Sequence, residues 1–319
     1  MNLYLKLKKY CIPKCWNRNV DDDSGFIIPK LKRAPKYWVL FDKRIIVTHY
    51  YKNALFTIFV VSLFIGIFQC ETLPAYYNDS PSLLKIVMWI LYGFFVYLIL
   101  RIITTDPGII PKDKFSDSLR RIVTEDSLLM SIATYNKNSQ NYCSVCHHNM
   151  PQKTIHCKRC NCCVVELDHH CKILGVCIGR RNYYLFVMML FVLAILNFIS
   201  MFISGSFILK EFNMSERSEW INIITIKYPF SMALILTNML AFLPILYMNI
   251  LHCQLISYEM GTYNYFIYSL EPSSETRLKK WTFVRMLRNY VKLFKRPTPP
   301  SLLRIGYISD DKLSSIIKN

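Results

Sequence analysis

The sequence predicts an all-α integral membrane protein with four transmembrane helices and a cysteine-rich domain between the second and the third. Three observations support this fold class. Of the 319 residues, 53% are hydrophobic and the mean hydropathy is +0.23, which is high for a soluble protein of this length. The chain contains four long apolar runs. Eight of its 12 cysteines lie in one segment between the second and third runs.

The four apolar runs have the length of membrane-spanning helices. They cover residues 54–70, 83–103, 183–209 and 229–251. A helix needs about 20 residues to cross about 30 Å of hydrocarbon. Four buried helices of a soluble protein are the alternative, but runs this long and apolar seldom form soluble cores. We therefore expect a multi-pass protein embedded in the lipid bilayer.

The lysines and arginines predict which side of the membrane each connection faces. Of these 39 residues, 12 precede residue 54, 12 lie in 101–182 and 11 lie in 252–319. The two short connections carry none and three, and the three are balanced by glutamates. Basic segments stay cytoplasmic. We therefore expect cytoplasmic segments at 1–53, 104–182 and 252–319, and lumenal connections at 71–82 and 210–228.

The net charge of +18 raises the alternative of nucleic-acid binding. The basic residues flank the membrane runs, however, where they would meet anionic lipid headgroups. We therefore expect the lipid bilayer, and no nucleic acid, as a partner. The membrane is expected to be an endomembrane (Golgi or endoplasmic reticulum) or the plasma membrane, with both termini and the cysteine-rich segment facing the cytoplasm.

The cysteine-rich segment reads CSVCHHNMPQKTIHCKRCNCCVVELDHHCKILGVC and lies in a domain of about residues 141–182. Cytosolic cysteines are kept reduced, so metal binding or catalysis is favoured over disulfides. Cys143 and Cys146 form one chelating Cys-x2-Cys pair, and Cys157 and Cys160 form another. Two closed zinc sites need about eight ligands, of which these pairs supply half. We expect two structural Zn²⁺ ions, and hence a zinc-knuckle domain that owes its folding to metal.

The remaining ligands cannot be assigned by spacing. Four more ligands are needed, and six residues are candidates: His156, Cys163, His169, His170, Cys171 and Cys177. Cys162, His147 and His148 are spares. If Cys171 and one histidine are left out, they form a thiol beside a base. If Cys171 is a ligand, the site is entirely structural. Both alternatives remain open on the residues alone.

The order of these residues resembles the cysteine-rich domain of the DHHC family of membrane protein S-acyltransferases (palmitoyltransferases). Two Cys-x2-Cys units, a His-Cys pair at 156–157 and the Asp-His-His-Cys run 168–171 are followed by Cys177, Asn182 and Phe186. Asp106-Pro107-Gly108 resembles the family's DPG motif. The resemblance covers about residues 100–190, and the four-helix topology is also similar.

The resemblance implies a division of the ligands. One zinc would take Cys143, Cys146, His156 and Cys163, and the other would take Cys157, Cys160, His170 and Cys177. Asp168, His169 and Cys171 would remain as the catalytic group. The implied reaction moves a fatty acyl group, expected to be palmitoyl, from acyl-coenzyme A to a protein cysteine in two steps through an acyl-Cys171 thioester. The partners would be acyl-coenzyme A and protein substrates with membrane-proximal cytoplasmic cysteines.

The implied chemistry follows ordinary thiol reactivity. A free thiol is mostly protonated at neutral pH, and the thiolate is the nucleophile. His169 would take the proton from Cys171 and later return one, while Asp168 would hold the imidazole in the right tautomer. The alternatives are that Asp168 only steadies a zinc-bound histidine and that Cys171 is a zinc ligand.

The sequence departs from the family pattern in three places. Lys172-Ile173 stands where Pro-Trp is usual. Met150-Pro151-Gln152-Lys153 stands where Lys-Pro-x-Arg is usual, which leaves Lys153 as the candidate contact for coenzyme A phosphates. Gly261-Thr262-Tyr263-Asn264 lacks the first Thr and the Glu of a Thr-Thr-x-Glu motif. Asn289 is a candidate for a C-terminal asparagine of the family.

Two other function classes compete with the enzyme. The first is a catalytically weak or inactive zinc-stabilised membrane scaffold, favoured by the change at Lys172-Ile173. The intact run 168–171 favours the enzyme, because a scaffold needs neither the acid nor a free thiol. The second is a metal transporter, which is disfavoured because the thiols cluster outside the apolar runs and no chain of acidic residues and histidines passes through them.

Overall fold

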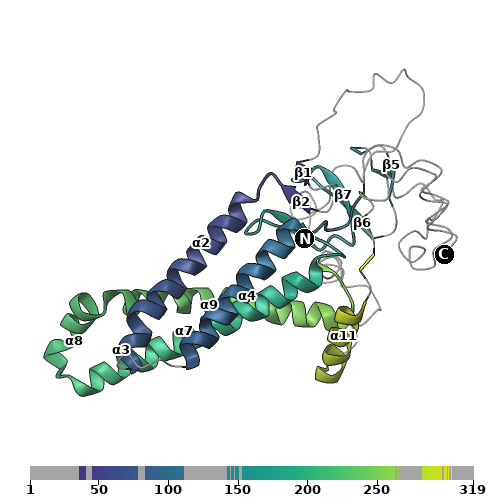
Figure 1. Cartoon of the computed structure of the whole chain (residues 1–319). Coiled ribbons are helices and arrows are strands. Elements are labelled where there is room, and N and C mark those ends of the chain that lie inside the picture. The colour runs from purple at the N-terminus through teal and green to yellow at the C-terminus, as the bar shows by residue number, and fades with distance from the viewer. Residues whose placement is uncertain are drawn as a thin grey trace, which may run out of the picture.

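The computed structural model describes residues 36–40, 45–77, 83–110, 142–143, 145–146, 148–150, 153–262, 265, 282–296, 298–299, 301 and 303. Four long helices lie side by side, and small sheets gather at one end of them (Figure 1). Most of the predicted N-terminal segment, the polar stretch 111–141 and most of the tail lie outside the described residues, as do His147, Gln152, Tyr263 and Asn264.

Four helices are long and apolar enough to cross a membrane. The first span, Lys52–Tyr76, combines α2 (Lys52–Ile67), a π-helical turn η2 (Phe68–Thr72) and most of α3 (Leu73–Tyr77). The others are α4 (Leu83–Thr104), α7 (Tyr183–Met214) and α9 (Pro229–Tyr258). Each helix extends beyond the apolar run that predicted it. Backbone hydrogen bonding continues past the point where hydropathy falls, so hydropathy alone places helix ends poorly.

The connection between α7 and α9 is itself helical. It contains a 3₁₀ turn η4 (Arg217–Glu219), a short helix α8 (Trp220–Asn222) and a π-helical turn η5 (Ile223–Lys227). The predicted connection 210–228 therefore consists largely of the end of α7 and these turns. Pro244, which belongs to the apolar run 229–251, lies inside α9.

Short antiparallel sheets make the cysteine-rich region, so the all-α prediction is wrong there. The ribbon β1 (Tyr37–Leu40)–β2 (Ile45–Thr48) precedes α2, and β3 (Ile109–Ile110), β7 (Cys162–Val165) and β6 (Thr154–Cys157) form a sheet in that order. The other two ribbons are β4 (Tyr142–Cys143)–β5 (His148–Asn149) and β8 (His169–Cys171)–β9 (Val176–Ile178). None of these strands exceeds four residues, which is too short for a period-two pattern to be read reliably.

The β8–β9 ribbon is built into the hydrophobic core of the helices. Cys171, Leu174, Val176 and Ile178 belong to the same buried cluster as residues of α2, α4 and α7. The end of the molecule that carries this ribbon is therefore fixed to the bundle by apolar packing. The strand with the Asp-His-His-Cys run lies where the helices end.

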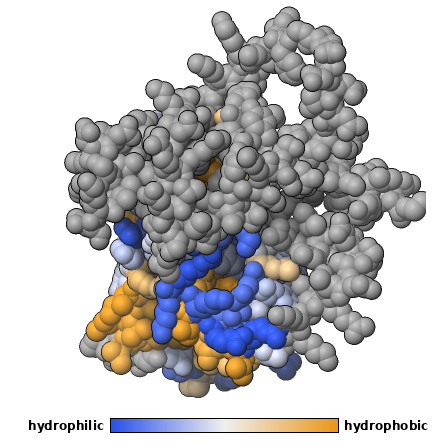
Figure 2. All heavy atoms as spheres, turned by 90° about the vertical axis from the view of Figure 1, so that its right-hand side faces the viewer, coloured by the Kyte–Doolittle hydropathy of each residue, from blue (hydrophilic) through white to orange (hydrophobic). Residues whose placement is uncertain are grey.

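A last helix, α11 (Phe283–Lys295), packs against α9. Asn289 is buried and donates to the backbone carbonyls of Ile256 and Ser257, both at 3.1 Å, near the end of α9. On the end of the molecule that carries α11, hydrophilic and hydrophobic residues lie directly beside one another (Figure 2). In α11 the exposed apolar residues Leu287 and Val291 lie beside the exposed basic residues Arg288 and Lys292, as in an amphipathic helix.

Candidate active site and metal centres

The alternation of a β-strand separates the two histidines of the Asp-His-His-Cys run. Successive side chains of a strand point to opposite faces, so His169 and Cys171 share one face of β8 and His170 has the other. The pairing of β8 with β9 places His170 opposite Cys177. One short strand therefore presents an imidazole and a thiol on one side and a metal-ligand candidate on the other.

Two clusters of three cysteines and one histidine have the geometry of metal sites. The first is Cys143, Cys146, His156 and Cys163, and the second is Cys157, Cys160, His170 and Cys177. Within each cluster the donor atoms all lie within 4.8 Å of one another. These are the two sets that the family resemblance implies.

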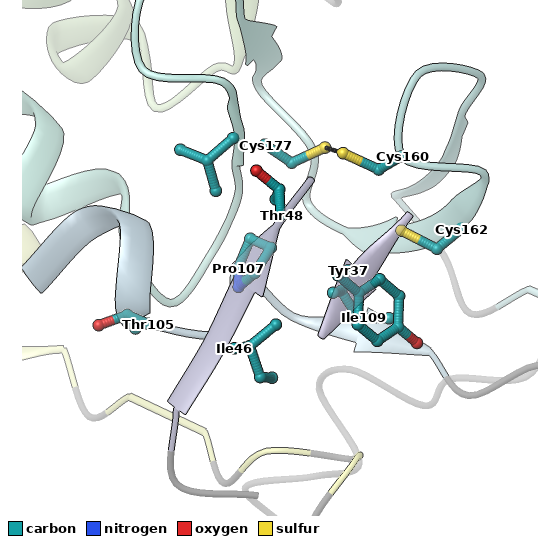
Figure 3. Close-up of a pocket in the computed structure, with 10 residues that line it drawn as sticks. Tyr37, Ile46, Thr48, Thr105, Pro107, Ile109, Cys160, Cys162 and Cys177 are labelled. Atoms are coloured by element: carbon teal, nitrogen blue, oxygen red, sulfur yellow. Dashed lines mark hydrogen bonds between the residues drawn. The ribbon is translucent and has the colours of Figure 1, made fainter. Parts of the chain in front are cut away.

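The distances inside each cluster fit a tetrahedral ion. The Sγ atoms of the first lie 3.3–3.7 Å from His156 Nδ1, and those of the second lie 3.3–3.7 Å from His170 Nδ1. Ligands at about 2.1–2.3 Å from a tetrahedral zinc are separated by roughly 3.6 Å. Figure 3 shows Cys160 and Cys177 facing each other, with their sulfur atoms 3.4 Å apart. Three thiols and an imidazole are a donor set that zinc favours.

Cys162 belongs to neither cluster. It is the partner of Cys157 across the β6–β7 pair, and its side chain is 1% exposed. Burial, followed by the nearby thiols, raises the pKa of Cys162 well above its ordinary value. A protonated buried thiol packs as a small apolar side chain, which accounts for this spare cysteine.

Asp168 and His169 form a buried hydrogen-bonded pair. His169 Nδ1 lies 2.9 Å from Asp168 Oδ2. Burial alone would lower the pKa of His169, but hydrogen bonds in which Asp168 and the Cys171 sulfur accept from the ring raise it to about 9. Because Asp168 occupies Nδ1, the second ring nitrogen is the one left to exchange a proton with Cys171. The three side chains thus form an acid–imidazole–thiol series.

The carboxylate of Asp168 is held by the segment that follows α9. Thr262 donates its backbone N–H to Oδ1 and its hydroxyl to Oδ2, both at 2.7 Å. Burial alone would raise the pKa of Asp168, but the hydrogen bonds from His169 and Thr262 lower it. Thr262 is the one threonine that remains of the Thr-Thr-x-Glu pattern, and its contact explains how Asp168 is oriented despite the missing Thr.

Asn182 supports the start of α7 and the end of the β8–β9 ribbon together. Its Oδ1 accepts from Gly179 N at 2.9 Å, and its Nδ2 donates to the Cys177 carbonyl at 3.0 Å. The side chain is completely buried. Phe186, one turn further on, packs its ring at 5.2 Å from the ring of His169. The Asn-x3-Phe spacing therefore connects the metal-ligand strand to the His169 pocket.

The DPG turn is a second structural junction. Asp106 Oδ1 accepts from Gly108 N and Ile109 N at 2.9 and 2.8 Å. Its Oδ2 accepts from Ser301 Oγ at 2.6 Å and lies 3.4 Å from Arg181. The turn after α4 is thereby connected both to the turn that precedes α7 and to the tail. Ser301 lies 195 residues away in sequence, so no local pattern could indicate this contact.

Three basic residues near the site differ in their contacts. Arg180 and Arg296 both bind the carboxylate of Glu166, which makes them structural rather than free for phosphate. Lys153, the candidate coenzyme A contact, is exposed and has a positive φ of 60°. Its backbone carbonyl accepts from Glu166 N at 2.9 Å.

A buried histidine in α9 lies beside the site and was missed by sequence reasoning. His252 is 1% exposed, its Nδ1 lies 3.0 Å from the Tyr183 hydroxyl, and its ring centre is 6.4 Å from that of His169. A histidine directly after the apolar run 229–251, at the end of a predicted membrane span, was the available signal, since ionisable groups at such positions need a partner.

The cysteine-rich region and the helices after it match a known domain. Residues 136–269 match the family model described as DHHC palmitoyltransferase. The chain is 35% identical over 150 residues to Palmitoyltransferase ERF2 of Kluyveromyces lactis, covering 44% of this chain and 41% of the relative. It is 32% identical over 146 residues to Palmitoyltransferase erf2 of Schizosaccharomyces pombe, covering 43% and 41%.

A longer alignment spans the helices as well. Palmitoyltransferase ZDHHC18-B of Danio rerio is 27% identical over 318 residues, which cover 90% of this chain and 79% of the relative. The chain spans less than half of the length of the two yeast relatives. The domain match and these relatives show that residues 136–269 of this chain form a domain of the DHHC palmitoyltransferase family.

Proposed function

We propose that the chain is a protein S-palmitoyltransferase that carries the acyl group on Cys171. The observation that carries the proposal is the arrangement on β8. Cys171 shares a strand face with His169, whose other nitrogen is 2.9 Å from the buried Asp168. A metal-bound scaffold without turnover would need only the opposite face of this strand, which carries His170. It would have no use for the buried Asp168 carboxylate next to His169, a histidine that belongs to neither cluster.

In the first step His169 takes the proton of the Cys171 thiol. The thiolate attacks the carbonyl carbon of acyl-coenzyme A, a new carbon–sulfur bond forms, and the bond to the coenzyme A sulfur breaks. The proton on His169 passes to the departing coenzyme A thiolate. Asp168 keeps Nδ1 protonated and stabilises the imidazolium between the two proton transfers.

In the second step a substrate cysteine repeats the attack on acyl-Cys171. His169 takes the proton of the incoming thiol, and the acyl group moves to the substrate sulfur. Cys171 leaves as a thiolate and recovers a proton from His169. Bonds of the same type are made and broken in both steps, so concentrations and partners set the direction.

The metal clusters and the helices support this chemistry without taking part in it. Zinc, the metal that we propose for both clusters, would cross-link β6 to β9 and the loops around them, and so fix His170 and its neighbours. An acyl chain of about 16 carbons gains about 0.8 kcal/mol per buried CH₂, so it favours the bilayer over water. The charge distribution supports a site and termini on the cytoplasmic side, next to substrates with membrane-proximal cysteines.

Labelled palmitoyl-coenzyme A tests the proposal on the purified full chain. We expect hydroxylamine-sensitive label on the wild type and on Cys70→Ser, an exposed cysteine outside the site, and none on Cys171→Ser. Addition of a cysteine-containing juxtamembrane peptide should remove the label from the enzyme. A wild type that takes no label, or a Cys171→Ser variant that labels fully, would support the scaffold instead.

A further inference from the structure

The loop that follows the nucleophile is a four-residue hairpin connection. Cys171 ends β8 and pairs with Val176 at the start of β9, so residues 172–175 join the two strands. We call these four residues the nucleophile loop. Lys172 and Ile173 occupy its first half, and both side chains are exposed. The first half of the loop, directly after the end of β8, is therefore not held in place by packing of its own side chains.

The carbonyl groups of this loop are held by side chains from the start of the first membrane span. Asn53 Nδ2 donates to the Lys172 carbonyl at 2.7 Å. The single Thr57 hydroxyl hydrogen is shared between the Ile173 carbonyl at 3.1 Å and the carbonyl of Asn53 in its own helix at 3.0 Å. The hydroxyl of Thr48, at the end of β2, donates to the Gly175 carbonyl. Figure 3 shows Thr48 on its strand next to Cys177. Three of the four loop carbonyls thus accept from residues 48–57, which we call the anchor segment.

The anchor segment also packs directly on the loop. A Cβ atom added to Gly175 would lie 2.1 Å from the Tyr50 carbonyl oxygen, and Gly175 has a φ of +66°. Only glycine permits both the close approach and the backbone conformation without strain. Ala54 is completely buried in the cluster that contains Cys171 and Leu174, so the first turn of α2 lies against the loop.

These contacts differ in kind from those that fold the metal clusters. The side-chain hydrogen bonds of Asn53 and Thr57 go to backbone carbonyls outside both clusters. Each side chain reaches a carbonyl within two residues of Cys171. Backbone carbonyls of a turn need partners, and here the partners come from another part of the chain. The loop is thereby fixed relative to the membrane span rather than by its own sequence.

We propose that Asn53 and Thr57 are positioning residues for acyl-enzyme formation. They hold the nucleophile loop by its carbonyls and so keep Cys171 within reach of His169, in a chain whose loop carries Lys172 and Ile173. The proposal rests on the proposed function, because it concerns the same reaction. Neither residue touches the reacting atoms.

The test uses Asn53→Leu and Thr57→Val, which remove the donors with little change in size. A lost hydrogen bond of this kind lowers a rate by about 3- to 10-fold. We expect that decrease in the rate of acyl-enzyme formation at saturating palmitoyl-coenzyme A, with an unchanged half-saturating concentration. Thr57→Ser keeps a hydroxyl and should restore the wild-type rate.

Thr237→Val is the matched control. Thr237 also donates to carbonyls of its own helix, at 2.8 and 3.1 Å, as Thr57 does to the Asn53 carbonyl, but it lies in α9 away from the loop. Its loss should leave the rate unchanged. A control variant that slows the reaction as much as Thr57→Val would overturn the assignment to the loop.

Two readings that do not depend on activity complete the experiment. Amide hydrogen exchange in the peptide that spans residues 172–176 should become faster in Asn53→Leu and Thr57→Val, while bound zinc per chain stays at the wild-type value. Unchanged exchange would refute the contacts, and faster exchange with a normal rate would refute the positioning role. Lost zinc would show that the contacts are structural. If the wild type forms no acyl-enzyme, the proposed function fails, and hydrogen exchange still decides whether the anchor segment holds the loop.

Discussion

Replacing Thr262 with valine tests how the orientation of Asp168 contributes to the reaction. Valine keeps the shape of threonine and removes the hydroxyl that donates to Asp168 Oδ2 at 2.7 Å. The backbone N–H at this position still donates to Oδ1 at 2.7 Å, so the segment should stay in place. Asp168 is only 7% exposed, and water therefore has little room to replace the lost donor.

The expected magnitude follows from the charge on the acceptor. A hydrogen bond to a charged group contributes about 1.5–3 kcal/mol. If this contribution holds Asp168 in line with His169 in the transition state, its loss slows acyl-enzyme formation by about 10- to 150-fold.

Single-turnover labelling measures this effect. The purified variant is mixed with excess labelled palmitoyl-coenzyme A, and hydroxylamine-sensitive label is followed with time. Thr262→Ser keeps the hydroxyl and serves as the control, with a rate close to wild type. A Thr262→Val rate within twofold of wild type, with normal zinc content, would refute the role given to this threonine.

Three further changes test the frame around the site. Gly175→Ala should destabilise the fold by about 2–5 kcal/mol, because its Cβ would lie 2.1 Å from the Tyr50 carbonyl oxygen at a positive φ; an unchanged melting temperature would contradict this packing. Cys157→Ala should lower bound zinc from two ions to one per chain, measured by atomic emission, and two retained ions would contradict the ligand set. Asp106→Asn weakens the contact with Arg181 and should lower the free energy of unfolding by about 1–3 kcal/mol, whereas a denaturant midpoint equal to wild type would speak against a supporting role.

The sequence predicted the membrane helices well and their ends poorly. Long apolar runs are visible without any tertiary information, but helix ends depend on backbone hydrogen bonds that continue into polar residues. Met214 and Tyr258 end α7 and α9, five and seven residues beyond the runs that ended at 209 and 251. The short strands were missed because pairing across two to four residues leaves no periodic signal.

The candidate site was only partly predictable from its residues. Spacing alone left Cys171 and the two adjacent histidines open between metal and chemistry, and the family resemblance supplied the division that the two donor clusters display. Strand alternation gives the physical reason for it. Contacts such as Asn53 with Lys172 join residues 119 positions apart, and no pattern within one sequence reports such a distance.

The central claim is that Cys171 carries the acyl group while its neighbour His170 belongs to a metal cluster. Peptide mapping by mass spectrometry after incubation of the metal-loaded chain with palmitoyl-coenzyme A tests this claim most directly. We predict one palmitoyl thioester, on the peptide that contains Cys171, and unmodified cysteines at all six cysteine positions of the two clusters. Palmitate on a cluster cysteine, or an unmodified Cys171 in a labelled chain, would contradict the account.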